Sequence, residues 1–165
     1  MALNAYLTLA GVKTGNIEGS VTQRGRERSI AVIATSHEVS SPRDAASGMA
    51  TGRRIHKPFV ITKEIDKSTP KLLNVLVTNE NLKEWTLKYW RSSVTGPATG
   101  VEQQHYTVKL TDASISSVRQ VMPNNKNPEL QRYETYEEVS FVYGQIEWTW
   151  VDGGISSVDS WGPAP

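Results

Sequence analysis

The stretch RRIHKPFVITKEIDKSTPKLLNVLVT, residues 53–78, decides the fold because a strand, a tight connection and a helix follow one another within it. Apolar and polar residues alternate from position 55 to position 65, which is typical of a half-buried strand. Pro58 lacks a backbone N–H and therefore indicates an edge, a bulge or the beginning of that strand. The residues expected on the buried face are Ile55, Phe59, Ile61 and Ile65.

The second half of this stretch predicts one helix at about residues 69–78. Ser68 or Thr69 can accept a hydrogen bond from the first turn, and Pro70 suits the first helical position, where no N–H is needed. Asn79 suits a left-handed residue that ends the helix. The apolar residues that recur at helical spacing and would pack on a sheet are Leu72, Leu73, Leu76 and Val77.

Composition restricts the classes of protein to which the chain can belong. Its 165 residues fit a single domain, 1–165, and a net charge of +1 implies no strong attraction to nucleic acid or to a membrane surface. The lack of cysteine excludes disulfides and cysteine metal sites, and fits a reducing cytoplasm. The N-terminus does not resemble a signal peptide and no apolar run could span a bilayer, so we expect any export to need no cleaved leader.

Strands are predicted for most of the remaining chain. The segments that lack apolar periodicity include a loop at about residues 40–53 and a C-terminal tail from about residue 152, which is expected to be loose apart from Trp161. A loop as long as the first of these, inside a compact domain, is usually functional or mobile. The predicted strands cover residues 2–10, 29–39, 83–91, 105–110, 112–121 and 136–151.

The last of these strands contains a change of parity. Val139, Phe141 and Tyr143 occupy odd positions, whereas Ile146 and the bulky residues after it occupy even positions. A one-residue bulge at the intervening glycine would restore a common face and bend the strand, as closure into a barrel requires. We therefore predict a mainly β fold, a flattened barrel or two packed sheets, with one flanking helix.

Motifs that would indicate catalysis or metal binding were not found. His37, His56 and His105 lie in separate predicted strands, so we interpret them as ordinary polar or half-buried residues rather than as zinc ligands. The chain has no G-x-S-x-G elbow and no phosphate-binding loop. We therefore predict a protein that is not an enzyme and that holds no cofactor or metal.

Five tryptophans leave an alternative open, which is a monomeric carbohydrate-binding β-sandwich that uses exposed indole rings. Trp85 shares its predicted face with Leu87, and Trp148 and Trp150 share theirs with Ile146, so packing in a core or an interface is the favoured interpretation. The basic run RGRER, residues 24–28, is more often solvated or paired with acids than bound to nucleic acid.

The segment IHKPFVITKEIDKSTPKLLNVL, residues 55–76, resembles the signature of the haemolysin-coregulated protein (Hcp) family, the tube proteins of bacterial type VI secretion systems. The similarity covers nearly the whole chain and leaves no room for a fused effector domain. The other matching segments are TLKYWR at 86–91, HYTVKLTDASI at 105–115, MP at 122–123, EEVSFVYGQIEWTWVDG at 137–153 and DSW at 159–161.

This resemblance implies a closed, flattened β-barrel with one flanking helix, assembled as a homohexameric ring. Rings would stack into a tube that a contractile sheath expels together with a spike, and small effectors would travel shielded in the lumen. Such a protein would leave the bacterial cytoplasm for the medium or a target cell without a cleaved signal peptide. The resemblance implies no catalysis, no nucleic-acid partner and no membrane insertion.

Several residues become candidates for contacts on this interpretation. Ser36 aligns with a lumen-facing position of the family. The loop at residues 40–53 is our candidate for an arm that reaches an adjacent subunit or the next ring, and the RGRER run could face Glu134, Glu137 or Glu138 of a neighbour. The residues expected at contacts between subunits or rings are Pro42, Arg43, Asp44, Met49, Arg53, Arg26 and Glu137.

Overall fold

The structure is a computed structural model that describes residues 2–94, 97 and 100–161. Strands dominate these residues, and a single α-helix, α1 (Thr69–Val77), accompanies them with two short 3-10 helices, η1 (Pro128–Leu130) and η2 (Asp152–Gly154). The strands are β1 (Ala5–Gly11), β2 (Gly15–Ile17), β3 (Ile30–Val32), β4 (Ala34–Ser36), β5 (Val39–Ser40), β6 (Ile55–His56), β7 (Phe59–Glu64), β8 (Asn81–Ser92), β9 (Glu102–Thr111), β10 (Ala113–Val121), β11 (Tyr136–Val142), β12 (Gln145–Trp150) and β13 (Ile155–Ser160).

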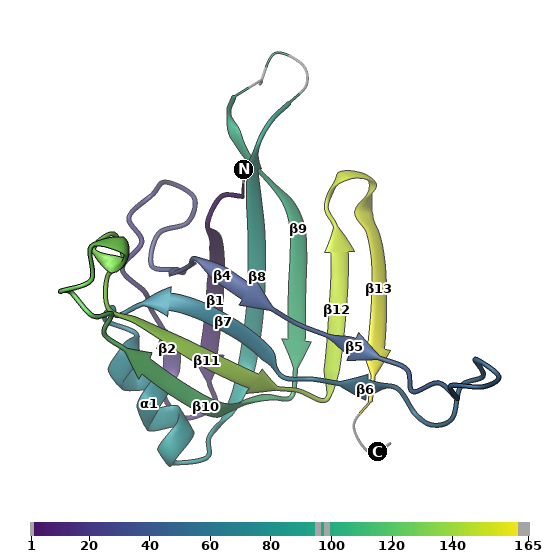
Figure 1. Cartoon of the computed structure of the whole chain (residues 1–165). Coiled ribbons are helices and arrows are strands. Elements are labelled where there is room, and N and C mark those ends of the chain that lie inside the picture. Colours follow the sequence, from purple (N-terminus) through teal and green to yellow (C-terminus); the bar gives the residue numbers. More distant parts are fainter. Residues whose placement is uncertain (1, 95–96, 98–99, 162–165) are drawn as a thin grey trace.

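The strands close into a barrel. β8 pairs with β1 along one edge and, through its first residues, with β10 along the other. β10 pairs with β11, β11 with β7, and β7 with β4. β3 pairs with β1 and continues through Ile33 into β4. The Ile33 N–H donates to the Thr62 carbonyl of β7, which completes the circle of strands. The prediction of a barrel with one helix is therefore confirmed (Figure 1).

Three strands extend the sheet beyond this barrel. β9 pairs with the later part of β8, β12 pairs with β9, and β13 pairs with β12 from Gln145↔Ser160 to Trp150↔Ile155. In Figure 1 they stand side by side, and β4, β7 and β11 cross in front of the sheet. The tail predicted to be loose from about residue 152 thus contains a strand. The prediction missed it because ISSVDS is exposed along almost its whole length and shows no apolar alternation.

The decisive stretch contains two strands rather than the one predicted. The chain leaves β6, which pairs only with β5, at Lys57 and enters the main sheet at Phe59, so the buried parity changes across the break. Ile55 and Ile65, which were expected to be buried, are exposed instead. Pro58 lies at the interruption, as its missing donor predicted.

Helix α1 begins and ends close to the predicted positions. Pro70 lies in its first turn, and Asn79 after its last turn has a φ of +53°, the left-handed conformation expected for a stop. Ser68 occupies the N-cap position, but its hydroxyl bonds to Asp66 rather than to the helix, so the predicted side-chain cap does not form. Among the described residues, no helix has the length and apolar character needed to cross a membrane.

The core is centred on Trp85, which is completely buried. Its ring meets Phe59 and Phe141 edge to face, with centroid distances of 5.2 and 5.4 Å. These aromatic residues come from β8, β7 and β11, so the cluster holds both sides of the barrel together. Leu72 and Val75 of α1 are buried in the same core, whereas Val77, which was predicted to pack there, is exposed.

A buried ion pair lies beside the first turn of α1. Lys63 of β7 and Glu137 of β11 are directly opposite each other in the ladder, and both are fully buried. The Lys63 ammonium lies 2.6 Å from the Glu137 carboxylate and 2.9 Å from that of Asp66, and the Thr69 hydroxyl donates to Glu137 at 2.9 Å. The pair therefore joins two strands of the barrel to the helix.

The change of parity after Tyr143 corresponds to a corner between two strands. β11 pairs with β10 and β7, whereas β12 pairs with β9 and β13, so the chain passes from the barrel wall to the extension at Gly144. The predicted bulge is thus replaced by a break, although the bend itself is confirmed. Register shifts are found elsewhere, between Ile115 and Ser117 of β10 and between Tyr89 and Trp90 of β8.

Candidate functional site

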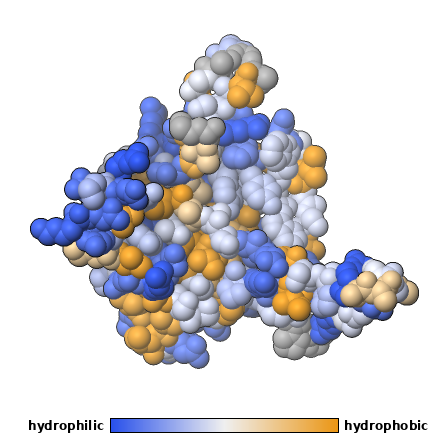
Figure 2. Space-filling model, viewed as in Figure 1, coloured by the Kyte–Doolittle hydropathy of each residue, from blue (hydrophilic) through white to orange (hydrophobic). Residues whose placement is uncertain are grey.

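The most prominent surface feature is the segment of residues 41–54, which connects β5 to β6 and is hereafter called the arm. It extends from the lower right of the barrel in Figure 1 and forms a separate lobe in the space-filling view of Figure 2. β5 and β6 pair only with each other, through Val39↔His56 and Ser40↔Ile55, so the arm continues a two-stranded ribbon that is not part of the main sheet.

The tip of the arm is a turn organised by Asp44. Its carboxylate accepts hydrogen bonds from the Ala46 N–H at 2.9 Å and the Ser47 hydroxyl at 3.0 Å, and these bonds lower the pKa of Asp44. Gly48 has a φ of +72°, a conformation that glycine adopts without strain. A bridge between Arg43 and Ala50 closes the turn, so the arm has a defined local structure.

The arm displays the residues that the sequence selected as contacts. Arg43, Asp44, Met49 and Arg53 are exposed, and Pro42 is half-buried. Met49 is 69% exposed and is the large apolar side chain of this tip. Within the part of the chain that the structure describes, the residues from Arg43 to Arg53 are all exposed.

The base of the arm is fixed to the C-terminal strand by Arg54. Its guanidinium donates to the Asp159 carboxylate from Nε at 2.5 Å and from Nη2 at 2.6 Å, and Nη2 also donates to the Ser160 carbonyl. The carboxylate is a bidentate partner for the planar guanidinium, and such pairs are stronger than single surface ion pairs. The hydrogen bond from Arg54, together with that from His56, lowers the pKa of Asp159.

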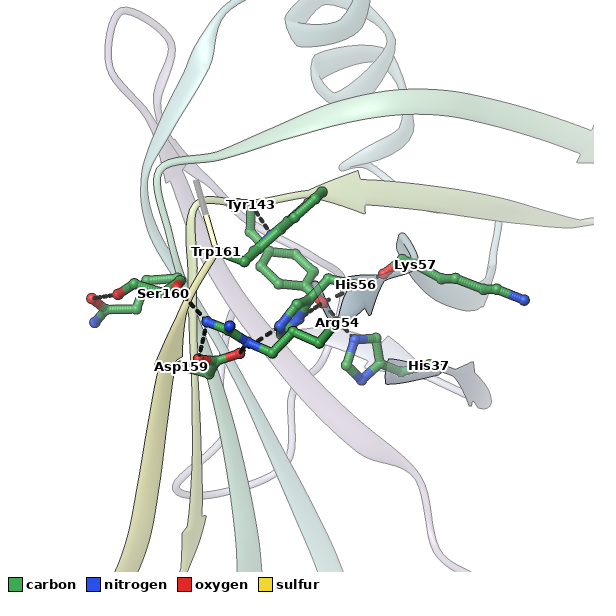
Figure 3. Close-up of polar contacts among 9 residues, drawn as sticks. His37, Arg54, His56, Lys57, Tyr143, Asp159, Ser160 and Trp161 are labelled. Carbon is green, nitrogen blue, oxygen red and sulfur yellow. Dashed lines mark hydrogen bonds and ion pairs between the residues drawn. The ribbon is translucent and has the colours of Figure 1, made fainter. Parts of the chain in front are cut away.

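Two histidines and a tyrosine continue this anchor into the protein (Figure 3). His56 is fully buried in its side chain, and its Nε2 lies 2.6 Å from the Asp159 carboxylate. Its Nδ1 lies 3.0 Å from the Tyr143 hydroxyl, which also lies 2.6 Å from Nε2 of His37. Burial, and then the charge of Asp159, raise the pKa of Tyr143 to about 12. Tyr143 is therefore a neutral phenol that joins both histidines.

Trp161 completes the anchor. Its indole ring stacks on His56 with a centroid distance of 5.4 Å, and its Nε1–H donates to the Tyr143 carbonyl at 2.8 Å. The docking predicted for Trp161 is therefore confirmed. Nothing in the local pattern indicated that His37, which lies between β4 and β5, and His56, in β6, would meet at one tyrosine from a third segment.

Other candidate residues lie away from the arm. Ser36, in β4, is exposed, as a contact with cargo would require. Arg26 pairs with Glu102 at 2.7 Å and stacks over the Trp90 ring, so it is largely satisfied within its own chain. Glu137 is fully buried against Lys63 and cannot reach another molecule. The expectation that Glu137 contacts a neighbouring subunit is therefore corrected.

The alternative carbohydrate-binding interpretation depended on exposed tryptophans. Trp85 is buried in the core, and Trp90, Trp148 and Trp161 are half-buried. Trp150 is 37% exposed, with the Arg91 guanidinium over one face of its ring. The five rings thus form no open stacking platform. Within residues 2–94, 97 and 100–161, no group of three or more His, Cys, Asp or Glu residues is placed to hold a metal ion.

Comparisons with known proteins agree on one family. The family profile described as "Type VI secretion system effector, Hcp" matches residues 6–150. A curated relative, the "Major exported protein" of Pseudomonas aeruginosa, is 37% identical over 170 residues, which cover 98% of this chain and 96% of that protein.

Solved structures give the same result. A crystal structure described as that of an Hcp protein superposes with a TM-score of 0.88 at 28% identity and covers 98% of this chain and 99% of its own. A doubly substituted Hcp1 from E. coli has a TM-score of 0.82 at 35% identity, with coverage of 97% and 99%. The secreted protein Hcp3 of Pseudomonas aeruginosa has a TM-score of 0.77 at 31% identity, with coverage of 96% and 97%.

Proposed function

Because this chain belongs to the Hcp family of type VI secretion proteins, we propose that it is a structural subunit of the secretion tube. Six copies form a ring, rings stack into a tube inside the contractile sheath, and the lumen carries and shields small effectors during export with the spike. The protein leaves the bacterial cytoplasm and performs no catalysis. The membership of the family, seen along nearly the whole chain, is the observation that carries this proposal.

The distribution of exposed groups supports ring assembly. A cyclic ring requires two different patches on each subunit, because each copy contacts its neighbours head to tail. The arm lies on one side of the barrel, and the loop after β10, with the exposed side chains of Met122 and Tyr133, lies on the other (Figure 1). With a net charge of +1, copies approach one another without strong repulsion.

The size of the chain suits a tube that carries folded cargo. Compactness scaling gives a domain of this length a diameter of roughly 40 Å. Six touching spheres in a ring enclose a hole as wide as one sphere, so the lumen is also roughly 40 Å across. Ser36 and the rest of β4 are exposed and form our candidate for part of the lumen wall.

Native mass spectrometry of the purified chain tests this assembly. The chain has a mass of 18.3 kDa. We expect a main species of six times that mass across a range of protein concentrations. A protein that stays monomeric at high concentration and binds a glycan array would instead favour the carbohydrate-binding alternative, and it would overturn the tube.

The arm provides a second test. Deletion of residues 45–50 removes the exposed tip, including Met49, but leaves β5, β6 and the anchor of Arg54 intact. We expect hexamers to form as before, because the barrel is unchanged, and tubes to be lost, because the segment that reaches the next ring is missing. Electron microscopy and native mass spectrometry measure the two outcomes separately. Tubes of normal length from the shortened chain would contradict the assignment of the arm to stacking.

A further inference from the structure

An open groove lies on the side of the barrel away from the arm. It is formed between the loop of residues 18–29 and the left-hand end of β7 in Figure 1, and its volume is about 620 Å³. Binding clefts are usually of roughly 300–1,000 Å³, so this groove has room for several side chains of another molecule. The residues that line it include Tyr6, Val21, Gln23, Ile33, Glu64 and Ile65.

Two isoleucines give the groove an apolar surface. Ile33, between β3 and β4, is 47% exposed, and Ile65, directly after β7, is 41% exposed. The Ile33 N–H donates to the Thr62 carbonyl at 2.9 Å, and the Ile65 N–H donates to the Thr135 carbonyl at 3.1 Å. Their backbones are therefore fixed while their side chains stay in contact with water, and an apolar partner would remove that exposed surface.

The loop that forms one wall of the groove is held in place by its own contacts. The Tyr6 hydroxyl of β1 donates to the side-chain oxygen of Gln23 at 2.5 Å. The Arg26 guanidinium lies over the Tyr6 ring and pairs with Glu102 of β9 at 2.7 Å. The groove is thus formed before any partner arrives, and little conformational freedom is lost when one binds.

The charge in the groove is negative. Of the described residues that line it, only Glu64 and Asp66 are charged. Asp66 shares the Lys63 ammonium with Glu137, so one cation faces two carboxylates there. Glu64 is exposed, and within the described part of the chain it belongs to no ion pair.

The tip of the arm has the complementary character. Arg43 and Arg53 are exposed, and among the residues that the structure describes neither belongs to an ion pair. Asp44 is held in its own turn by the Ala46 N–H. Met49 adds an exposed apolar side chain. The tip therefore offers a net positive charge and an apolar side chain, which match the carboxylates and the isoleucines of the groove.

The groove does not receive the arm of its own chain. Arg54 fixes the base of the arm to Asp159, and the arm projects from the side of the barrel opposite to the groove (Figure 1). A contact between an arm and a groove therefore joins two copies through different patches, which is a head-to-tail contact. Such contacts can continue from copy to copy, as a stack of rings requires.

We propose that the groove receives the tip of the arm from a second copy of this chain, and that the two copies belong to adjacent rings. Met49 packs on the two isoleucines, and the two arginines of the tip face Glu64 and Asp66. Apolar burial supplies affinity in this contact, and the charges set its orientation. The inference rests on the proposed function, because it names the surface on which the arm acts in stacking.

Crosslinking tests this contact directly, because the chain has no cysteine of its own. Ala46→Cys places a thiol at the tip of the arm and Thr22→Cys places one in the groove, and both positions are exposed. A short bismaleimide should join the two sites between chains and give, on a denaturing gel, a ladder longer than a single ring of six. Ala46→Cys combined with Ser156→Cys, an exposed position in β13 outside the groove, should give no ladder.

Charge reversal in the crosslinking background identifies the groups responsible. Glu64→Lys places a like charge opposite the arginines and should lower the yield of crosslinked chains at least about tenfold. Combination with Arg43→Glu or Arg53→Glu should recover part of that yield, because one pair of opposite charges is restored. Glu84→Lys changes an exposed acid outside the groove and should leave the yield as it was. All these positions are exposed, so the variants should keep the fold, which circular dichroism checks.

The outcomes separate this inference from the proposed tube. If no ladder forms in samples that contain hexamers by native mass spectrometry and tubes by electron microscopy, the groove is overturned and the tube stands. If no hexamers form, the tube is contradicted, and the groove is then supported by crosslinked pairs and overturned by their absence. A ladder that ends at six chains supports the groove as the receiving surface but overturns its placement between adjacent rings.

Discussion

Replacement of Lys63 by methionine is expected to lower the free energy of unfolding by about 3–5 kcal/mol. Lys63 and Glu137 are both fully buried, and the ammonium also bonds to Asp66 and to the hydroxyl of Thr69. Methionine fills a similar volume but leaves the Glu137 carboxylate in the core without its cation. The cost therefore comes from desolvation of an unpaired charge, which is larger than the net gain from an intact pair.

Urea denaturation at pH 7 and at fixed protein concentration measures this change, since assembly would make stability depend on concentration. The double variant Lys63→Met with Glu137→Leu removes both charges and should recover much of the loss. Lys57→Met is a matched control, because Lys57 is exposed and its pair with Glu38 lies at the surface; it should change stability by less than about 1 kcal/mol. A single Lys63 variant as stable as this control would contradict the argument.

Replacement of Trp85 by alanine is expected to lower the free energy of unfolding by about 3–5 kcal/mol. Trp85 is the largest of the fully buried side chains, and its ring meets Phe59 and Phe141 edge to face. Alanine would leave a cavity where β7, β8 and β11 converge, and neighbours held by paired strands cannot relax to fill it. The same denaturation experiment measures the loss.

Phenylalanine at this position is the informative comparison. The Trp85 Nε1–H is buried and has no hydrogen-bond partner, so tryptophan already carries the cost of a buried donor there. Trp85→Phe keeps an aromatic ring against Phe59 and Phe141 and removes that donor, so it should cost far less than alanine. If Trp85→Phe lowered the free energy of unfolding as much as Trp85→Ala, the argument from ring packing would be contradicted, because the loss would then come from the indole nitrogen.

The periodicity of the sequence predicted those elements in which one face is apolar. Trp85 and Leu87 were placed correctly on a buried face of β8, and α1 was located through Pro70 and Asn79. Lys63 shares the parity of Phe59 and Ile61 and is buried with them. Periodicity carries no information about which acid neutralises a buried lysine.

Features that depend on contacts distant in the sequence were missed. Glu137 was assigned to a subunit contact because a charged residue is usually at the surface, whereas the ladder between β7 and β11 places it opposite Lys63. β13 was missed because a strand that extends the edge of a sheet needs no apolar face. The meeting of His37 and His56 at Tyr143 depends on three segments and gives no local signal.

The bond between Arg54 and Asp159 spans 105 residues and ends close to the last part of the chain that the structure describes. At a synthesis rate of about 5–20 residues per second, a ribosome makes Asp159 roughly 5–20 s after Arg54. During that interval the arm exists without the residue that holds it in place. A nascent chain therefore has no positioned arm until its C-terminal strand has been made, so the time needed for translation sets the earliest moment at which the arm can be fixed.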